Sequence, residues 1–289
     1  MSHLPINRSL PTTFLALCAL MALSSVVNAT LIVQGYTPQK HDRFYTGADK
    51  AFIGEAFDWS GVGRSTSWWC TMISPTYFLS ANHAHNTSGP VTFYPGNTTS
   101  NPQTYTIDSS FGRAVGPDLW LGRLTAPIPT SANIAYYPIQ KLASNSNYLG
   151  ETIYVYGLTN RIGRNVVSSI ENSYYMNFNY DTYGQGDSLG IDEAFLQGGD
   201  SGGPSFTAVN GSLALLGTHR GISPSGQEWS QDNFAPPLIA LLNAFMGMGS
   251  DEQITIVGAN ITAPEPGTWA MLLVAGMAAS LTYVRRRRK

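Results

Sequence analysis

The segment Gly199-Asp200-Ser201-Gly202-Gly203-Pro204 has the residue types that nucleophilic catalysis needs. A serine hydroxyl attacks a carbonyl group only when a neighbouring base removes its proton and when main-chain N–H groups stabilise the oxyanion that forms. Glycines on both sides of a serine allow a tight turn in which two N–H groups point at one place. The segment therefore predicts that Ser201 is a nucleophile.

The same residues also fit the G-x-S-x-G pattern of the α/β-hydrolases, in which the serine is followed by an acid and then by a histidine. The one histidine after Ser201 is His219, and no acidic residue separates the two. The chain also lacks the alternating strand and helix pattern of an α/β fold. The order of the residues therefore excludes an α/β-hydrolase.

Three segments of the sequence resemble, in order, the catalytic motifs of the trypsin-like serine proteases of the chymotrypsin fold. The segment at Ser201 resembles the motif of the active serine. The run from Cys70 to Ala84, which ends in Ser80-Ala81-Asn82-His83-Ala84, resembles the histidine motif, and Asp118-Leu119-Trp120-Leu121-Gly122-Arg123-Leu124 resembles the aspartate motif. The order His, Asp, Ser is that of chymotrypsin-type enzymes.

This resemblance implies a role for each residue. His83 is the general base, Asp118 orients it, Ser201 is the nucleophile, and the N–H groups of Gly199 and Ser201 form the oxyanion hole. Such an enzyme requires no cofactor and no metal ion. His85 is the local alternative to His83, and Asp108 is the alternative to Asp118.

The resemblance leaves two features to be settled. Cys70 occupies the first position of a disulfide that is usual in the family, but Ala84 replaces the second cysteine, so this bond is absent. The aspartate that matches Asp200 pairs, in the family, with an N-terminal ammonium created by zymogen cleavage. Here Ile32-Val33-Gln34-Gly35 is similar to the family's N-terminal motif, and the alternative is that it forms only a first strand.

The resemblance also predicts where substrate specificity is set. The pocket floor lies six residues before the active serine, which is Phe195, although a shift in alignment would place Asp192 or Glu193 there. His219 matches a histidine that binds acidic side chains in the glutamyl endopeptidases of this fold. Arg220 next to it would add positive charge for a carboxylate. The alternative is that His219 belongs to the pocket wall and reads no charge.

Short apolar or alternating runs separated by Gly, Pro, Asn and Ser predict an all-β body. Candidate strands are 91–94, 105–107, 152–156, 166–170 and 213–218, and apolar residues at helical spacing predict one helix over 237–246. The resemblance covers residues 52 to 246. It implies two packed six-stranded antiparallel β-barrels followed by a C-terminal helix.

The two ends of the chain predict export and sorting. Residues 1–29 have one basic residue, an apolar stretch and a small-residue end at Ala29, as in a secretory signal peptide. Residues 30–246 are the expected protease domain and 247–263 a linker. Residues 264–289 begin Pro-Glu-Pro, continue with a predicted transmembrane segment and end in four arginines and a lysine. They resemble the PEP-CTERM sorting signal of Gram-negative bacteria, which implies transient membrane anchoring, processing by an exosortase and a cell-surface or extracellular location.

Composition narrows the classes of function. Between residues 30 and 263 there are ten basic and 17 acidic residues, so this body lacks the positive surface of a nucleic-acid-binding protein. The sequence predicts a secreted serine endopeptidase that acts on proteins or peptides through an acyl-enzyme. The alternative is a surface-displayed binding or matrix protein with a protease fold and little turnover.

Overall fold

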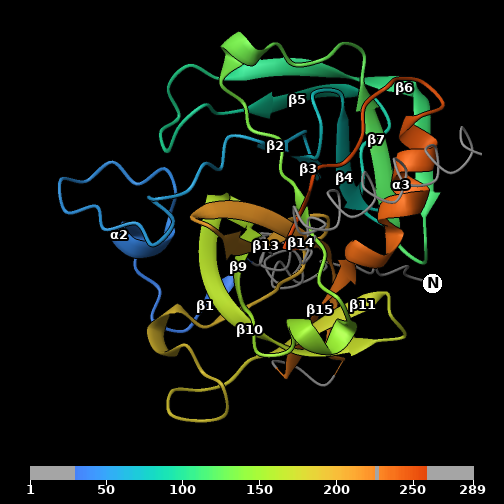
Figure 1. Cartoon of the computed structure of the whole chain (residues 1–289). Coiled ribbons are helices and arrows are strands. Elements are labelled where there is room, and N and C mark those ends of the chain that lie inside the picture. The colour runs from blue at the N-terminus through green and yellow to red at the C-terminus, as the bar shows by residue number, and fades with distance from the viewer. Residues whose placement is uncertain (1–29, 225–227, 259–289) are drawn as a thin grey trace, which may run out of the picture.

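A computed structural model describes residues 30–224 and 228–258 and contains two closed six-stranded antiparallel β-barrels (Figure 1). The first barrel has the strand order β2-β3-β4-β7-β6-β5. In the second, β9, β10, β11, β15 and β14 follow one another, and β13 closes the barrel by pairing with both β14 and β9. The predicted all-β fold of two barrels with a C-terminal helix is confirmed.

The strands of the first barrel are β2 (Val62–Arg64), β3 (Trp69–Met72), β4 (Tyr77–Ala81), β5 (Gly89–Phe93), β6 (Gln103–Val115) and β7 (Leu119–Leu124). Those of the second are β9 (Thr152–Gly157), β10 (Arg161–Glu171), β11 (Tyr175–Asn179), β13 (Pro204–Val209), β14 (Ser212–Ile222) and β15 (Trp229–Phe234). Two short pairs lie outside the barrels' closed rings: β1 (Ile32–Val33) with β12 (Ala194–Phe195), and β8 (Ile139–Gln140) with β16 (Ile256–Val257). The five candidate strands overlap β5, β6, β9, β10 and β14.

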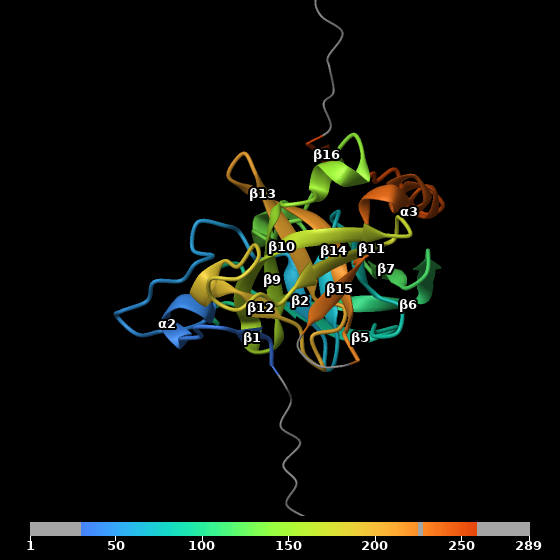
Figure 2. The ribbon, with the colours of Figure 1, turned by 90° about the horizontal axis from the view of Figure 1, so that it is seen from below.

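Helices are short and lie at the flanks. The helix α2 (Pro38–His41) and the terminal helix α3 (Ile239–Met246) lie on opposite sides of the molecule (Figure 2). The 3₁₀ turns are η1 (Thr130–Ala132), η2 (Asn145–Tyr148), η3 (Leu158–Asn160), η4 (Gly190–Asp192) and η5 (Pro236–Leu238). The predicted helix over 237–246 thus consists of η5 and α3, while α2 was not predicted because four residues carry too little periodic signal.

One hydrophobic core joins the two barrels. It includes Trp69, Tyr77 and Leu121 of the first barrel and Tyr156 and Phe206 of the second. The ring centroids of Trp69 and Tyr156 are 5.3 Å apart. Because aromatic pairs of this kind add about 0.5–1.5 kcal/mol each beyond the area they bury, the barrels are docked firmly.

Cys70 is a free cysteine in the core of the first barrel. Ala84, at the position of the family's second cysteine, is also fully buried. Burial raises the pKa of the Cys70 thiol far above its usual range, so the residue acts as a small apolar side chain. The two positions that a disulfide would join are therefore occupied by small, fully buried side chains.

The folded domain extends beyond the predicted boundary at Met246. Part of the expected linker 247–263 packs against the barrels: β16 pairs with β8, Ile254 is buried, and both carboxylate oxygens of Glu252 accept hydroxyl hydrogen bonds, from Ser74 and Thr76. The polar and glycine-containing composition of this segment suggested a linker, but its few apolar residues are buried.

The expected signal peptide and sorting signal lie outside the described residues. Within 30–224 and 228–258, no helix is long and apolar enough to cross a membrane. The predicted transmembrane segment belongs to the undescribed C-terminal part of the chain.

Candidate active site

The register of two neighbouring strands brings His83 and Asp118 together. In the antiparallel pair of β4 and β7, Ala81 lies opposite Leu119. The residues just beyond this pair, Asn82 and Asp118, are therefore neighbours, and the N–H of Asn82 donates to the carbonyl oxygen of Asp118 at 2.6 Å. The loop after β4 and the turn before β7 thus place two catalytic candidates that are 35 positions apart.

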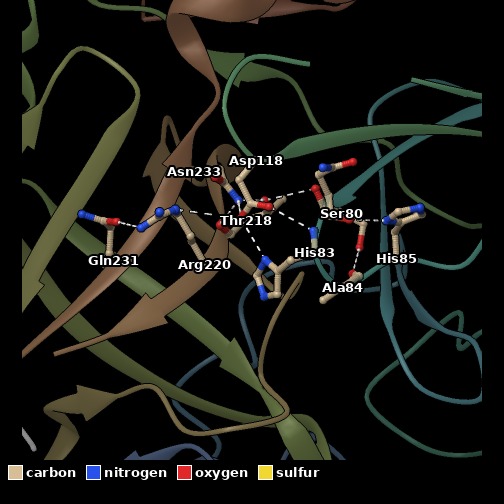
Figure 3. A network of polar contacts seen from close by, with 10 residues as sticks. Ser80, His83, Ala84, His85, Asp118, Thr218, Arg220, Gln231 and Asn233 are labelled. Atoms are coloured by element: carbon tan, nitrogen blue, oxygen red, sulfur yellow. Dashed lines mark hydrogen bonds and ion pairs between the residues drawn. The ribbon is translucent and has the colours of Figure 1, made fainter. Parts of the chain in front are cut away.

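The carboxylate of Asp118 binds His83 at two points (Figure 3). Its Oδ2 accepts a hydrogen bond from Nδ1 of the His83 ring at 2.8 Å, and its Oδ1 accepts one from the His83 main-chain N–H at 2.9 Å. A carboxylate can only accept, so Nδ1 carries the proton and Nε2 is the basic nitrogen of the neutral ring. The His83 side chain is 44% exposed, while that of Asp118 is 14% exposed.

Asn233 and Arg220 add contacts to Asp118 from the second barrel (Figure 3). Nδ2 of Asn233 donates to Oδ2 of Asp118 at 3.3 Å, and Nε of Arg220 lies 4.0 Å from the same oxygen. Partial burial raises the pKa of Asp118, but its hydrogen bonds with His83 and Asn233 outweigh burial and lower the pKa below its usual value. Asp118 therefore stays ionised at neutral pH. The sequence analysis did not find Asn233, because β15 carries no motif that marks it.

Ser201 lies on a loop between β12 and β13 that begins with a tight turn. The N–H of Asp200 donates to the carbonyl oxygen of Gln197 at 3.1 Å, and Gly199 between them has φ +100°. This is the pattern of a type II turn, whose third residue needs a positive φ and is usually glycine. The N–H groups of Gly199 and Ser201 form no hydrogen bond with the described residues.

The loop of Ser201 packs directly against the segment that carries His83. A Cβ atom built on Gly202 would lie 2.6 Å from Oγ of Ser80 and 2.9 Å from the carbonyl oxygen of Ala84. The chain can approach this closely only because residue 202 is glycine, which also has φ +79°. The neighbours of Ser201 and His83 in sequence are thus in contact. Within the described part of the chain the Ser201 hydroxyl forms no hydrogen bond, and catalytic hydrogen bonds are often long before substrate binds.

Asp200 is buried and holds this loop in place. Its Oδ1 accepts a hydrogen bond from the N–H of Leu158 at 2.7 Å, and its Oδ2 accepts one from the N–H of Gln197 at 2.8 Å. Burial raises the pKa of Asp200 to about 6, although these two hydrogen bonds oppose the shift. Among the described residues, two main-chain N–H groups thus bind the Asp200 carboxylate, and its pairing with an N-terminal ammonium stays a prediction. Ile32 and Val33 form the strand β1, which is the alternative that the sequence left open.

A pocket of about 170 Å³ adjoins Ser201. Its walls are formed by residues of the serine loop and of β14, namely Leu196, Gln197, Gly198, Asp200, Ser201, His219, Gly221 and Ile222. We call it the acyl pocket. Phe195 does not line it: the Phe195 ring is buried 5.5 Å from that of Tyr180, and the next residue, Leu196, contributes to the wall instead. Successive residues of an extended chain face opposite sides, so the predicted position was wrong by one residue.

His219 lies in the wall of the acyl pocket with both ring nitrogens engaged. Nδ1 is 2.8 Å from Oδ1 of Asp232, and Nε2 is 3.0 Å from the carbonyl oxygen of Tyr156. Burial lowers the pKa of His219, but the charge of Asp232 and the hydrogen bonds outweigh burial and raise it. Both partners are acceptors, which favours a doubly protonated ring paired with Asp232. This arrangement favours a wall residue over a receptor for acidic side chains.

Asp192 and Glu193, the two alternatives for the pocket floor, form their contacts outside the acyl pocket. Asp192 accepts a hydrogen bond from Arg164 at 2.5 Å and lies 3.2 Å from Nε2 of His41. Glu193 is buried and accepts a hydrogen bond from the N–H of Leu189 at 2.7 Å. Neither residue lines the acyl pocket.

The alternatives to His83 and Asp118 are also engaged elsewhere. The His85 ring stacks on Trp120 with a centroid distance of 3.6 Å. Asp108 accepts hydrogen bonds from Ser110 and Arg123, which lower its pKa to about 2. Among the described residues, no group of three or more His, Cys, Asp or Glu side chains is arranged to hold a metal ion.

Comparisons with known proteins do not define a family for this chain. No protein-family model matches the chain, and no curated protein matches it. Among solved structures, the chain is similar to kallikrein-related peptidase 10, with 14% sequence identity and a TM-score of 0.45. The alignment covers 74% of this chain and 98% of that chain.

Proposed function

We propose that this protein is a serine endopeptidase that hydrolyses peptide bonds through an acyl-enzyme. The observation that carries the proposal is the double hydrogen bond between Asp118 and His83, made by a segment that packs against the loop of Ser201. A carboxylate that fixes both the ring and the main chain of a partly exposed histidine sets the tautomer that general-base catalysis needs.

In this mechanism, Nε2 of His83 takes the proton of the Ser201 hydroxyl as Oγ attacks the substrate carbonyl carbon. The resulting imidazolium is stabilised by Asp118, and the oxyanion by the N–H groups of Gly199 and Ser201. His83 then protonates the leaving amine as the peptide C–N bond breaks, which leaves the acyl group as an ester on Ser201. Water, deprotonated by His83, hydrolyses this ester and restores the serine.

The acyl pocket supports a preference for the residue before the scissile bond. Leu196, Ile222 and the backbone of Gly221 give it mainly apolar walls, and His219 is already paired with Asp232. We therefore expect cleavage after small or medium apolar residues. A peptide library that varies this residue tests the expectation. If glutamate is preferred there, and if His219→Ala abolishes that preference, His219 is a receptor for acidic side chains after all.

A fluorophosphonate probe tests the activity itself, because it reacts with an activated serine and not with ordinary serines. The protein should be labelled at Ser201, and Ser201→Ala and His83→Ala should abolish labelling. His85→Ala is a matched control, since His85 lies two residues from His83 and stacks on Trp120. A folded protein that is not labelled would support the alternative of a binding or matrix protein with a protease fold.

We also propose that the protein is exported and that its C-terminal tail is removed. The support is in the sequence: a signal-like segment before Thr30, and the Pro-Glu-Pro, apolar and basic segments of residues 264–289. Intact-mass analysis of protein released from cells tests this. Released protein that still includes residues 285–289 would mean that the tail is only an anchor.

A further inference from the structure

A second hollow, of about 540 Å³, borders the serine loop at Gly199. Its walls come from both barrels: Arg64 and Trp69 of the β2–β3 hairpin, and Thr159 and Asn160 of the turn between β9 and β10. It shares no lining residue with the acyl pocket, whose walls include Gly198 and Asp200 on either side of Gly199. The turn of the oxyanion hole therefore separates the two hollows. We call the second one the Arg64 pocket.

The direction of a bound substrate follows from this arrangement. When the scissile carbonyl oxygen lies at the N–H groups of Gly199 and Ser201, the side chain of the acyl residue enters the acyl pocket. The leaving amine is attached to the other side of the same carbonyl carbon and must run away from that pocket. The Arg64 pocket is the hollow that borders Gly199 on that course.

We propose that the Arg64 pocket binds the leaving-group side of the substrate and selects a carboxylate within its first two residues. This inference rests on the proposed peptidase function and specifies its substrate class. The carboxylate would come from an acidic side chain or from the end of the peptide.

Arg64 has the properties of a carboxylate receptor. Its guanidinium lies over the Trp69 ring at 5.2 Å, and its Nη2 donates to the carbonyl oxygen of Ser67 at 2.9 Å. Its Nε is buried without a hydrogen-bond partner among the described residues, and no described carboxylate lies within ion-pair distance of it. A stacked, half-buried guanidinium whose planar donors are mostly unused matches the two oxygens of a carboxylate.

The charges around Arg64 also favour the binding of a carboxylate. Burial lowers the pKa of Arg64, and the negative charge of Asp200 opposes this shift only in part. Asp200 itself is buried and already accepts two main-chain hydrogen bonds. An incoming carboxylate would therefore compensate a charge that the fold leaves largely unbalanced.

The opposite wall of the Arg64 pocket is strained and is attached to the oxyanion loop. Thr159 and Asn160 have φ 62° and 60°, and the left-handed region is unfavourable for a β-branched threonine. The preceding residue, Leu158, donates its N–H to Asp200. Strained residues of this kind persist where the surroundings hold them, often at ligand sites. The wall is thus held at a fixed position relative to Gly199.

The test uses internally quenched peptides with one acyl side and varied leaving-group sides. For the native enzyme, kcat/KM should be about tenfold higher with Glu than with Gln at the first or second position after the scissile bond. In Arg64→Gln this Glu to Gln ratio should fall to unity, whereas Arg64→Lys should retain part of it. Peptides that end there in a free carboxylate or a carboxamide distinguish chain-end recognition from side-chain recognition.

Arg113→Gln is the matched control for the loss of one positive charge. Arg113 is exposed on β6, its guanidinium donates to the carbonyl oxygen of Gly112 and lies over the Phe111 ring, and it lines neither pocket. This variant should keep both the activity and the Glu to Gln ratio. Equal cleavage of Glu and Gln peptides by the native enzyme, or an unchanged ratio in Arg64→Gln, would overturn the inference while the peptidase function stood.

A binding measurement separates failure of the inference from failure of the proposed function. In Ser201→Ala protein, Gly-Glu-Gly amide should shift the NMR signal of the Trp69 indole N–H at lower concentrations than Gly-Gln-Gly amide does. The difference should disappear when Arg64→Gln is added. An enzyme that fails to label with fluorophosphonate but shows this difference would refute the peptidase and keep the carboxylate site. Equal binding of the two peptides would refute the site.

Discussion

Asn233 of the second barrel donates a hydrogen bond to Asp118 of the first barrel, 115 positions away in sequence. The same Nδ2 also lies 3.4 Å from the carbonyl oxygen of Thr218. The carboxylate that orients His83 is therefore held by residues of both barrels, and its position depends on how the barrels dock.

Loss of any member of the proposed triad should lower kcat by several orders of magnitude, about 10⁴-fold or more. The variants are Ser201→Ala, His83→Ala and Asp118→Asn. Their effects should be far from additive, because the three residues act as one unit. Thermal unfolding confirms that each variant is folded, and near-normal turnover in folded His83→Ala would refute the assignment.

Replacing Asn233 should affect the pH profile as well as the rate. In Asn233→Ala, Asp118 loses a hydrogen-bond donor, so its charge acts more strongly on the protonated His83 ring. We expect a several-fold lower kcat and an acidic limb of the rate profile that moves to higher pH. Asn179→Ala, on the exposed face of β11, is the control. A lower rate with an unmoved acidic limb would indicate a purely structural role for Asn233.

The oxyanion hole should form without a free N-terminus at Thr30, because main-chain N–H groups of Leu158 and Gln197 already bind Asp200. Protein that begins at Thr30 and protein with extra residues before it should hydrolyse a small ester at equal rates. A small ester is the right substrate because Thr30 lines the Arg64 pocket, which a larger leaving group would enter. Activity confined to the form that begins at Thr30 would show that processing activates the enzyme.

Glu193 should make stability depend on pH in a direction unusual for a carboxylate. Burial raises its pKa from 4.5 to about 7, although main-chain hydrogen bonds from Leu189 and Asp181 oppose the shift. Between these values the folded state binds more protons than the unfolded state, so the contribution of Glu193 to stability falls as pH rises through the window. Glu193→Gln does not titrate there.

The measurement is the midpoint of thermal unfolding of the native protein and of Glu193→Gln from pH 5 to pH 8. The difference should move in favour of the variant as pH rises and should stay constant above the folded pKa. Glu171→Gln removes an exposed carboxylate and controls for the change in net charge. Parallel curves for the native protein and Glu193→Gln would contradict the assigned shift.

Contacts made by contiguous motifs could be predicted from the sequence, and contacts set by tertiary packing could not. The glycines around Ser201 specify a turn locally, and the structure has that turn at Gly199, whereas the role of the loop stays a prediction. Alternating apolar residues likewise predicted β9, where Ile153 and Val155 are buried, and a continuous apolar run predicted β14, in which residues 213–219 are all buried.

The sequence analysis failed in two kinds of place. In one, a shift of a single residue decides which way a side chain faces; in the other, the contact partner is distant in sequence. Leu196 lines the acyl pocket instead of Phe195, since a shift by one residue reverses the face of an extended chain. Nothing near Asn233 in sequence indicates that it binds Asp118. The packing of Ile254 and the pairing of β16 were missed because two or three apolar residues in a polar segment give no periodic signal.

The segment after β15 determines how far the polypeptide can be shortened from its C-terminus without loss of contacts between the barrels. The helix α3 leaves the second barrel and reaches the first, where the Tyr77 hydroxyl donates to the Met246 carbonyl oxygen, and Glu252 then binds Ser74 and Thr76. This segment is a clasp that holds the barrel of His83 and Asp118 against the barrel of Ser201. Any shedding enzyme or expression vector that ends the polypeptide before Gly258 would therefore open the clasp.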